Sequence, residues 1–378
     1  MKKSNITVIV FFVVAIAFLS VASMVNPIRE YSESENRVLA QMPDFSLKSV
    51  FDGSFTKDYE SFVTDQFVWR DLWIKIKSGV ERTMGKTLSN GVYFADDGYF
   101  IEHKSESDID SELLDKNIGF LENHVKKMSE VIDGKVLVSI APTASVILKD
   151  KLPPLNDEYD FDTKLDYVRD SLGENFVDLR DALYESREEY IFYRTDHHWT
   201  GEGAYIAYRE IAEKLGFTPL DESEIEKETV STDFLGTVIA KLNIKAEPDT
   251  ITSYKPGNNT VESVNYNLGA KVTDTLYSDE KLQTRDKYAY FLGGNDALIE
   301  INTSVYNGRV LMLAKDSFAN CMISLLTAHF EKIYVVDLRY FNLGLVEYTK
   351  TLGDVTDSLV LYNISGYADD RYAFKLAR

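Results

Sequence analysis

An apolar run that ends in a polar turn, VLMLAKDSFAN at residues 310–320, decides the fold class of this 378-residue chain. Successive rather than alternate positions are apolar, which is typical of a strand buried on both faces of a parallel sheet. The run ends in Asp316 and Ser317, and a helix is predicted at 318–330. Ligands of such sheets bind beyond the carboxyl ends of the strands, so Ser317 is predicted to face that crevice. An Asp-Ser pair before a helix also serves as a plain helix cap.

The same pattern recurs along the chain. Apolar strands alternate with amphipathic helices, which predicts an α/β fold with a doubly wound, mainly parallel sheet. Strands are predicted at 135–142, 176–179, 190–193, 309–314, 332–337 and 359–362, and further helices at 110–131, 161–172, 203–215 and 343–352. Two turn signals, Asn90-Gly91 and Asp97-Gly98, predict a small hairpin around 92–94. The segment 217–301 interrupts the alternation and is predicted to be an inserted, partly β subregion.

The N-terminus predicts a membrane anchor. Lys2 and Lys3 precede an uncharged apolar run at 6–25, which has about the length of a bilayer-spanning helix. The run exceeds the roughly 7–15 residues of a cleaved signal, although Val21-Ala22-Ser23 offers a cleavage site; a buried core helix is the other interpretation. We expect a retained signal anchor at 1–26, a stalk with packing helices at 27–89 and a catalytic domain at 90–378, outside the cytoplasm at the cell membrane.

Charge and cysteine content exclude several classes of function. The formal net charge is −20 and no basic patch is present in the sequence, so nucleic acid is not an expected partner. Cys321 is the only cysteine, which rules out an intramolecular disulfide and a thiolate metal cluster.

A second polar cluster, YRTDHHWTG at 193–201, follows a predicted strand. Alternate side chains of an extended segment share a face, so Asp196 and His198 project together and His197 points away. A carboxylate in this place holds Nδ1 of the imidazole and leaves Nε2 as a base. The alternative is a helix start with packing histidines. With Ser317, the cluster predicts a catalytic triad.

The motif Asp196-His197-His198-Trp199 resembles that of DHHW-family proteins, which look like alginate O-acetyltransferases of the AlgJ/AlgX type. Those proteins are similar to SGNH hydrolases, with a flavodoxin-like sheet, but are circularly permuted, so the Asp-x-His pair precedes the serine as it does here. The resemblance extends over nearly the whole mature chain. Its other segments are 32–37 (SESENR), 65–70 (DQFVWR) and 90–93 (NGVY).

The resemblance implies roles for the clustered residues. Asp196 matches the orienting acid, His198 the general base and Ser317 the acylated nucleophile, while His197 and Asp316 are expected to support them without touching substrate. Lys315 departs from the Gly-Asp-Ser spelling of SGNH hydrolases. The implied activity is acetyl transfer to an exopolysaccharide or cell-wall polysaccharide, with a membrane-bound MBOAT-type acyltransferase as acyl donor and no cofactor or metal.

Further candidate residues have two interpretations each. Asn295, in Gly293-Gly294-Asn295-Asp296, matches the Gly-x-Asn-Asp block that supplies an oxyanion donor, or belongs to an ordinary turn. Arg339 and Tyr340 follow a strand end, which makes them candidates for binding substrate oxygens. The alternative is a salt bridge between Arg339 and Asp337. Trp199 either stacks on a sugar or covers the imidazole.

Three other functions remain possible from the sequence. A polysaccharide acetyl esterase uses the same triad, with water as the acyl acceptor. A manganese phosphoesterase also contains an Asp-His-His motif, but it needs further ligand motifs, which the contexts of His103, His124 and His329 lack. A non-catalytic polysaccharide-binding or assembly protein is the third, because folds do not fix function.

Overall fold

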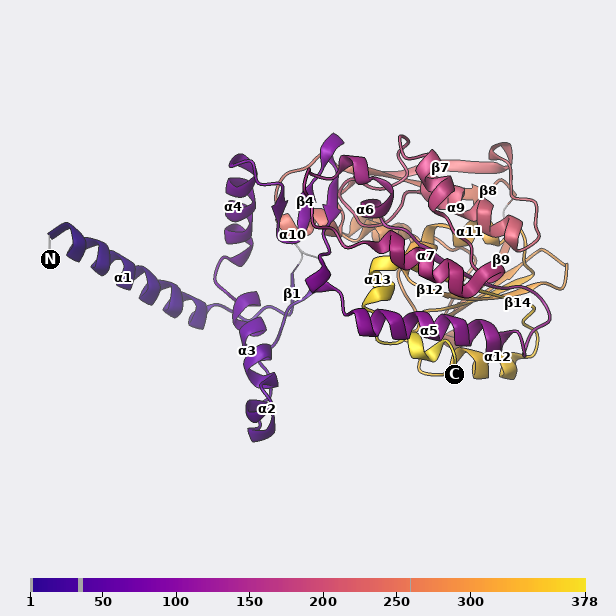
Figure 1. Cartoon of the computed structure of the whole chain (residues 1–378), viewed down its shortest axis with the longest axis horizontal. Helices are drawn as coiled ribbons and strands as arrows, with labels where there is room; N and C mark the ends of the chain where they lie inside the picture. The colour runs from indigo at the N-terminus through magenta and orange to yellow at the C-terminus, as the bar shows by residue number, and fades with distance from the viewer. Residues whose placement is uncertain (1–2, 33–36, 259) are drawn as a thin grey trace. The chain divides into compact units, whose positions relative to one another are not determined.

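The structure is a computed structural model that describes residues 3–32, 37–258 and 260–378 (Figure 1). Lys2 and residues 33–36 of the 32–37 segment lie outside the described residues. The chain divides into two compact units. The first comprises Met1–Asn90 with Ala240–Lys245, and the second comprises Gly91–Ile239 with Ala246–Arg378.

The first unit is mainly helical. Its elements are α1 (Lys3–Val25), the short antiparallel pair β1 (Tyr31–Ser32) and β2 (Arg37–Val38), α2 (Leu47–Phe51), α3 (Ser54–Asp65), α4 (Arg70–Thr83) and β3 (Leu88–Ser89). Among the described residues, α1 alone is a helix long and apolar enough to cross a membrane, by length and composition. It occupies the place of the predicted anchor.

A seven-stranded mixed sheet forms the centre of the second unit, in the order β10-β9-β11-β13-β12-β14-β6. The strands are β6 (Val136–Ala141), β9 (Val261–Tyr266), β10 (Lys271–Thr273), β11 (Leu298–Thr303), β12 (Val310–Lys315), β13 (Lys332–Val336) and β14 (Asp357–Asn363). β13, β12, β14 and β6 are parallel, whereas β10, β9 and β11 add antiparallel pairs. The prediction of a mainly parallel sheet is therefore wrong, because the inserted segment contributes an antiparallel half.

Helices cover the sheet on both sides. α5 (Ser111–Met128) and α12 (Leu345–Leu352) lie on one side, and α9 (Gly201–Lys214) and α11 (Ile323–Leu326) lie on the other (Figure 1). α5 begins where the Asp110 side chain accepts from the Leu113 amide, and its apolar stripe of Leu114, Ile118 and Leu121 is buried. The unit also contains α6 (Ala144–Ile147), α7 (Phe161–Leu172), α8 (Arg180–Glu185), α10 (Thr237–Leu242, whose last three residues belong to the first unit) and α13 (Ile364–Ala368).

Two predicted strands and one predicted helix differ in the structure. The segments 176–179 and 190–193 form only single bridges, Val138 with Phe176 and Phe192 with Trp199. The second bridge folds residues 193–198 into a tight loop, because Phe192 pairs with a residue only seven positions later. The helix predicted at 318–330 is divided into the 3₁₀ turn η9 (Ser317–Cys321) and α11, since Asp316 caps a short first turn.

The smaller β elements follow the turn signals. β4 (Val92–Phe94) and β5 (Phe100–Glu102) pair as the predicted hairpin, with Asp97 at a left-handed φ of 56° in the turn. The inserted segment also forms a separate antiparallel pair, β7 (Ile225–Phe234) and β8 (Asp249–Pro256). The insertion is thus partly β, as predicted, and it belongs to two different sheets.

Candidate active site

Ser317, His198 and Asp196 are joined in one continuous series of hydrogen bonds. Ser317 Oγ lies 2.7 Å from His198 Nε2, and His198 Nδ1 lies 2.6 Å from Asp196 Oδ1. Ser317 follows β12 at the carboxyl edge of the sheet, as predicted, and His198 lies in the loop before α9. His198 and Asp196 are buried, whereas Ser317 is half-buried. Ser317 is therefore the most accessible of the three residues.

Burial sets the protonation states of the pair. Desolvation lowers the pKa of His198 to about 4, and the neighbouring His197 acts in the same direction. Burial alone would raise the pKa of Asp196, but the two histidines and the Thr237 amide hold the pKa of that carboxyl well below its usual range. At neutral pH a neutral imidazole thus lies between a carboxylate and a hydroxyl, which is the arrangement of a general base.

The carboxylate of Asp196 is held by the segment that opens α10. Its Oδ2 accepts from the Thr237 amide at 2.8 Å and from the Thr237 hydroxyl at 3.0 Å. Gly236 allows this approach, because a Cβ on Gly236 would lie 2.2 Å from Asp196 Cβ and 2.3 Å from its Oδ2. Neither residue is singled out in the sequence, where Gly236-Thr237 has no recognisable pattern.

The loop that carries Asp196 is fixed by a second buried carboxylate, Asp249 at the start of β8. Its oxygens accept from the Thr195 amide at 2.7 Å and hydroxyl at 2.6 Å, from the Arg194 amide at 2.9 Å and from the Tyr190 hydroxyl at 2.5 Å. One side chain therefore satisfies four donors of the 190–195 segment. Because Asp249 comes from the inserted segment, sequence spacing gave no signal for it.

His197 is connected to the triad through Thr237. His197 Nδ1 lies 2.8 Å from Thr237 Oγ1, and its ring packs on that of His198 with centroids 3.9 Å apart. A hydroxyl has one proton, and Thr237 donates it to Asp196, so His197 Nδ1–H is the donor to Thr237. The prediction that His197 points away is therefore wrong, because its Nδ1 also lies 3.6 Å from Asp196 Oδ1, on the same side as His198.

Two aromatic residues, Tyr288 and Phe318, lie against the imidazole of His198, and Trp199 packs behind Phe318. Tyr288 stacks on His198 with centroids 3.8 Å apart, and its hydroxyl donates to the Ser317 carbonyl at 3.0 Å. Phe318 lies against the same ring at 5.3 Å. The Trp199 indole is fully buried and donates to the Phe318 carbonyl at 2.8 Å. Sugar stacking by Trp199 is therefore wrong, because the ring has no exposed face; Tyr288 was not predicted.

Asp316 shapes the turn that presents Ser317. Its Oδ1 accepts from the Phe318 amide at 2.9 Å, and its Oδ2 accepts from the Asn363 amide and side chain at 2.8 and 2.6 Å. Asp316 thereby joins the ends of β12 and β14. The Phe318 amide is occupied by this bond and therefore is not available as an oxyanion donor at the start of η9.

Lys315 connects the Gly-Gly-Asn-Asp segment to the nucleophile turn. Its side chain is fully buried, and Nζ donates to Asn295 Oδ1 and to Asn320 Oδ1, both at 2.8 Å. Burial lowers the pKa of Lys315 to about 8. Since Lys315 only donates, Asn295 must turn its oxygen inward and keep Nδ2 for another acceptor. Lys315, which stands where SGNH hydrolases have glycine, thus connects Asn295 to Asn320. The oxyanion role of Asn295 stays a prediction.

Arg339 forms the predicted alternative contact. Its Nε and Nη2 donate to the two oxygens of buried Asp337 at 2.9 and 2.6 Å. The Arg339 side chain is nevertheless 40% exposed. The ring of Tyr340 beside it is exposed as well. Substrate binding by Arg339 and Tyr340 stays a prediction.

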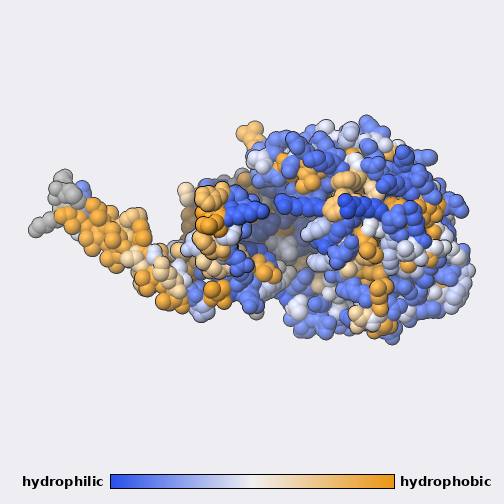
Figure 2. Space-filling view, turned by 90° about the horizontal axis from the view of Figure 1, so that it is seen from below, coloured by the Kyte–Doolittle hydropathy of each residue, from blue (hydrophilic) through white to orange (hydrophobic). Residues whose placement is uncertain are grey.

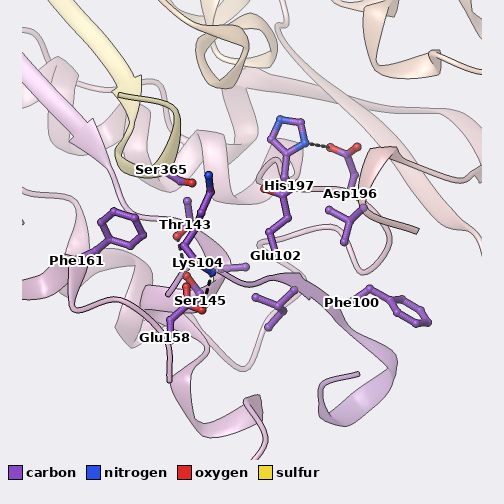
Figure 3. Close-up of a pocket in the computed structure, with 13 residues that line it drawn as sticks. Phe100, Glu102, Lys104, Thr143, Ser145, Glu158, Phe161, Asp196, His197 and Ser365 are labelled. Carbon is purple, nitrogen blue, oxygen red and sulfur yellow. Dashed lines mark hydrogen bonds and ion pairs between the residues drawn. The ribbon is translucent and has the colours of Figure 1, made fainter. Parts of the chain in front are cut away.

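A narrow cleft with a cavity volume of about 20 Å³ lies beside Asp196 and His197 (Figure 3). Asp196 and His197 line one end, and Glu158 and Ser145 lie toward the other. Burial raises the pKa of Glu158 to about 6, and its Oε2 accepts from the Lys104 amide at 3.2 Å. Ser145 and Glu158 were not predicted, because Ser145 lies in α6 and Glu158 in a loop, and neither belongs to a recognisable motif.

Asp196, His197 and His198 also bring possible metal-ligand atoms within 4.8 Å of one another. However, His198 uses Nδ1 toward Asp196 and Nε2 toward Ser317. A metal ion on this imidazole would therefore displace one of the two triad partners. The donor set fits a triad better than a metal centre.

The chain is similar to known proteins in sequence and in fold. A family model described as "DHHW protein" matches residues 122–336, while no curated protein matches the chain. A DHHW family protein from Eubacterium siraeum has a similar structure, with a TM-score of 0.63, 26% identity, and coverage of 76% of this chain and 95% of that one. PatB1 of Bacillus cereus, solved with a sulfonyl adduct, gives a TM-score of 0.63 at 17% identity, covering 76% and 98%.

Proposed function

This chain belongs to the DHHW protein family, and we propose that it is an extracytoplasmic O-acetyltransferase that modifies hydroxyl groups of a polysaccharide through an acyl-serine intermediate. One observation carries the proposal: Ser317, His198 and Asp196 form an unbroken hydrogen-bonded series with the serine half-buried. The resemblance of the 196–199 motif to alginate O-acetyltransferases supports acetyl as the group and a polysaccharide as the acceptor. The SGNH-like, circularly permuted topology is part of the same proposal.

The proposed reaction has two half-reactions at one serine. Ser317 Oγ attacks the acyl carbonyl carbon while His198 Nε2 takes its proton, and His198 then returns the proton to the leaving group of the donor. An acceptor hydroxyl next gives its proton to His198 and attacks the acyl-serine, which releases Ser317 Oγ with the proton from His198. Asp196 fixes the Nδ1–H tautomer and stabilises the imidazolium in both steps.

The acyl donor and acceptor follow from the proposed location. Outside the cytoplasm acetyl-CoA is absent, so we propose that a membrane-bound acyltransferase of the MBOAT type supplies the acyl group. The length and apolar composition of α1 support an anchor that keeps the chain near that partner. We place the acceptor at Ser317, the half-buried member of the triad, because an acceptor hydroxyl must reach the acyl group on that residue.

The test is mass spectrometry of the full chain, solubilised in detergent, after reaction with a chromogenic acetyl ester. An adduct of about 42 Da on Ser317 is expected from acylation of a serine hydroxyl, and it should be absent in Ser317→Ala and strongly reduced in His198→Ala. Adding oligosaccharide then separates two activities. Acetylated sugar supports a transferase, whereas acetate release that sugar leaves unchanged identifies an esterase. Absence of any adduct, with sugar binding retained, would identify a non-catalytic binding protein.

A further inference from the structure

The outer face of α4 is exposed, apolar and continuous. Trp69, at the helix start, and the α4 residues Leu72, Trp73, Ile76 and Val80 all leave between 43% and 53% of their surface exposed. At 3.6 residues per turn, the five side chains fall within about 120° of the helix circumference. A stripe of this size on a soluble surface marks a contact site. Figure 2 shows apolar residues gathered over the N-terminal part of the chain, whereas the visible face of the second unit is mostly hydrophilic.

Two contacts connect the start of this stripe to α1. The Trp69 ring lies 6.3 Å from the Phe18 ring, and the Val68 amide donates to Ser23 Oγ at 3.4 Å. Phe18 lies seven residues before the end of α1 at Val25, which is about 10 Å along a helix. If α1 spans the bilayer, Trp69 therefore lies within reach of the hydrocarbon boundary, where tryptophan is enriched.

The backbone and the charges of α4 fit the same location. Trp69 has a left-handed φ of 55°, a conformation that a bulky residue adopts only when its surroundings fix it. Four basic and two acidic residues make α4 positive, whereas the whole chain has a net charge of −20. Anionic lipid headgroups attract a basic amphipathic helix, and they repel the rest of this acidic chain.

We propose that α4 is an interfacial helix that lies in the lipid headgroup region, with Trp69, Trp73, Ile76 and Val80 toward the acyl chains. This inference rests on the proposed anchoring by α1. The helix would give the chain a second attachment to the bilayer, beside the end of α1, and would fix the orientation of the first unit on the membrane surface. A bilayer is favoured over a protein partner because the stripe continues the lipid-facing surface of α1.

The three tryptophans of the chain provide the test. Trp69 and Trp73 belong to the stripe, whereas Trp199 is fully buried in the second unit. The full chain is reconstituted into phosphatidylcholine and phosphatidylglycerol vesicles with brominated acyl chains, which quench indoles that they contact. Because two of three indoles are interfacial, we expect a loss of roughly two thirds of the emission. The Trp69→Phe/Trp73→Phe variant, which retains Trp199, should lose none.

Controls separate this inference from its premises. Ile76→Ser/Val80→Ser should reduce quenching, whereas Leu155→Ser, at an exposed apolar residue of the second unit, should leave it unchanged. Ser317→Ala should be quenched like the unaltered chain, because the readout is independent of acyl transfer. A chain that floats with vesicles but is not quenched would overturn the inference while supporting the anchor. The stripe on α4 would then be a contact surface for a protein partner. A chain that does not float would overturn both.

Discussion

The ring of Tyr288 lies flat on the ring of His198, with centroids 3.8 Å apart and planes inclined by 13°. The same tyrosine donates its hydroxyl to the Ser317 carbonyl, so one side chain contacts both the base and the backbone of the nucleophile. This relationship links the 3₁₀ segment η8 (Lys287–Tyr290) of the insertion to the triad.

Substitution of Tyr288 should separate its two contacts. Tyr288→Phe keeps the stacked ring and loses the hydroxyl, which contacts the Ser317 carbonyl and Cys321 Sγ. Acylation of Ser317 should slow by roughly three- to tenfold, the usual worth of the bond to the nucleophile's carbonyl. Tyr288→Leu also frees the imidazole and should cost at least another tenfold. Burst kinetics with a chromogenic acetyl ester measure both. Equal rates for the two variants would show that the ring packing is irrelevant.

Gly236→Ala should disable the base while leaving the fold intact. The new Cβ would lie 2.2 Å from Asp196 Cβ, so the carboxylate must move and lose the Thr237 bonds or the His198 bond. We expect a fall in kcat of about 100-fold or more, toward the loss seen when the orienting acid is removed. Gly119→Ala is the matched control, because its Cβ would meet nothing within 4 Å and alanine favours a helix interior. Unchanged kcat in Gly236→Ala would contradict the assigned role of Asp196.

Lys315 and Asn295 should be energetically coupled. Lys315→Met leaves the Asn295 oxygen without its buried donor, and Asn295→Ala leaves Lys315 with one partner fewer. A double-mutant cycle on the free energy of unfolding should give a coupling of about 1.5–3 kcal/mol, as for a hydrogen bond to a charged group. The same cycle on kcat then tests whether the link also positions catalytic groups. Strict additivity in both would mean that the two side chains act separately.

Acylation of Ser317 should keep its full rate down to an unusually low pH. Burial lowers the pKa of His198 to about 4, so the basic form persists at all higher pH values. The rate of Ser317 acylation should stay level from neutral pH and fall as the pH drops through about 4. An ordinary histidine would lose its activity through about 6.5. A fall in the acylation rate through about pH 6.5 would show that the imidazole is more solvated than it is in the structure.

Stability should depend on the buried histidine His124. Burial lowers its pKa to about 4, so between about pH 6.5 and 4 the unfolded chain binds a proton that the folded chain does not. The free energy of unfolding should therefore fall by about 3 kcal/mol over this window from His124 alone. Urea titrations at several pH values measure the slope, which should be shallower in His124→Asn and unchanged in Ser317→Ala. An unchanged slope in His124→Asn would refute this assignment.

The sequence predicted the groups whose function depends on short spacing. Asp196 and His198 are two residues apart, and Ser317 follows a buried apolar run, so local patterns predicted the three side chains that the structure joins by hydrogen bonds. The parallel strands and α7 were predicted for the same reason. Contacts made by residues distant in sequence could not be predicted: Asp249 holds a loop more than fifty residues earlier, and Tyr288 reaches back to His198. The strand predicted at 190–193 failed because its backbone pairs locally: the Tyr193 amide donates to the His198 carbonyl, and the Thr200 amide donates to the Ile191 carbonyl.

Asp249 has a consequence for anyone who recombines this chain with its relatives. The carboxylate, together with Gly236 and Thr237, belongs to the segment 217–301, yet all its partners in the triad region lie at 190–198. A chimera that exchanges 217–301 without 190–198 would combine a foreign residue at position 249 with the native loop that Asp249 holds. Trimming the insertion to a minimal enzyme would remove Asp249 altogether. The segment from Tyr190 through Pro256 should therefore be exchanged as one block, so that Asp249 keeps its partners.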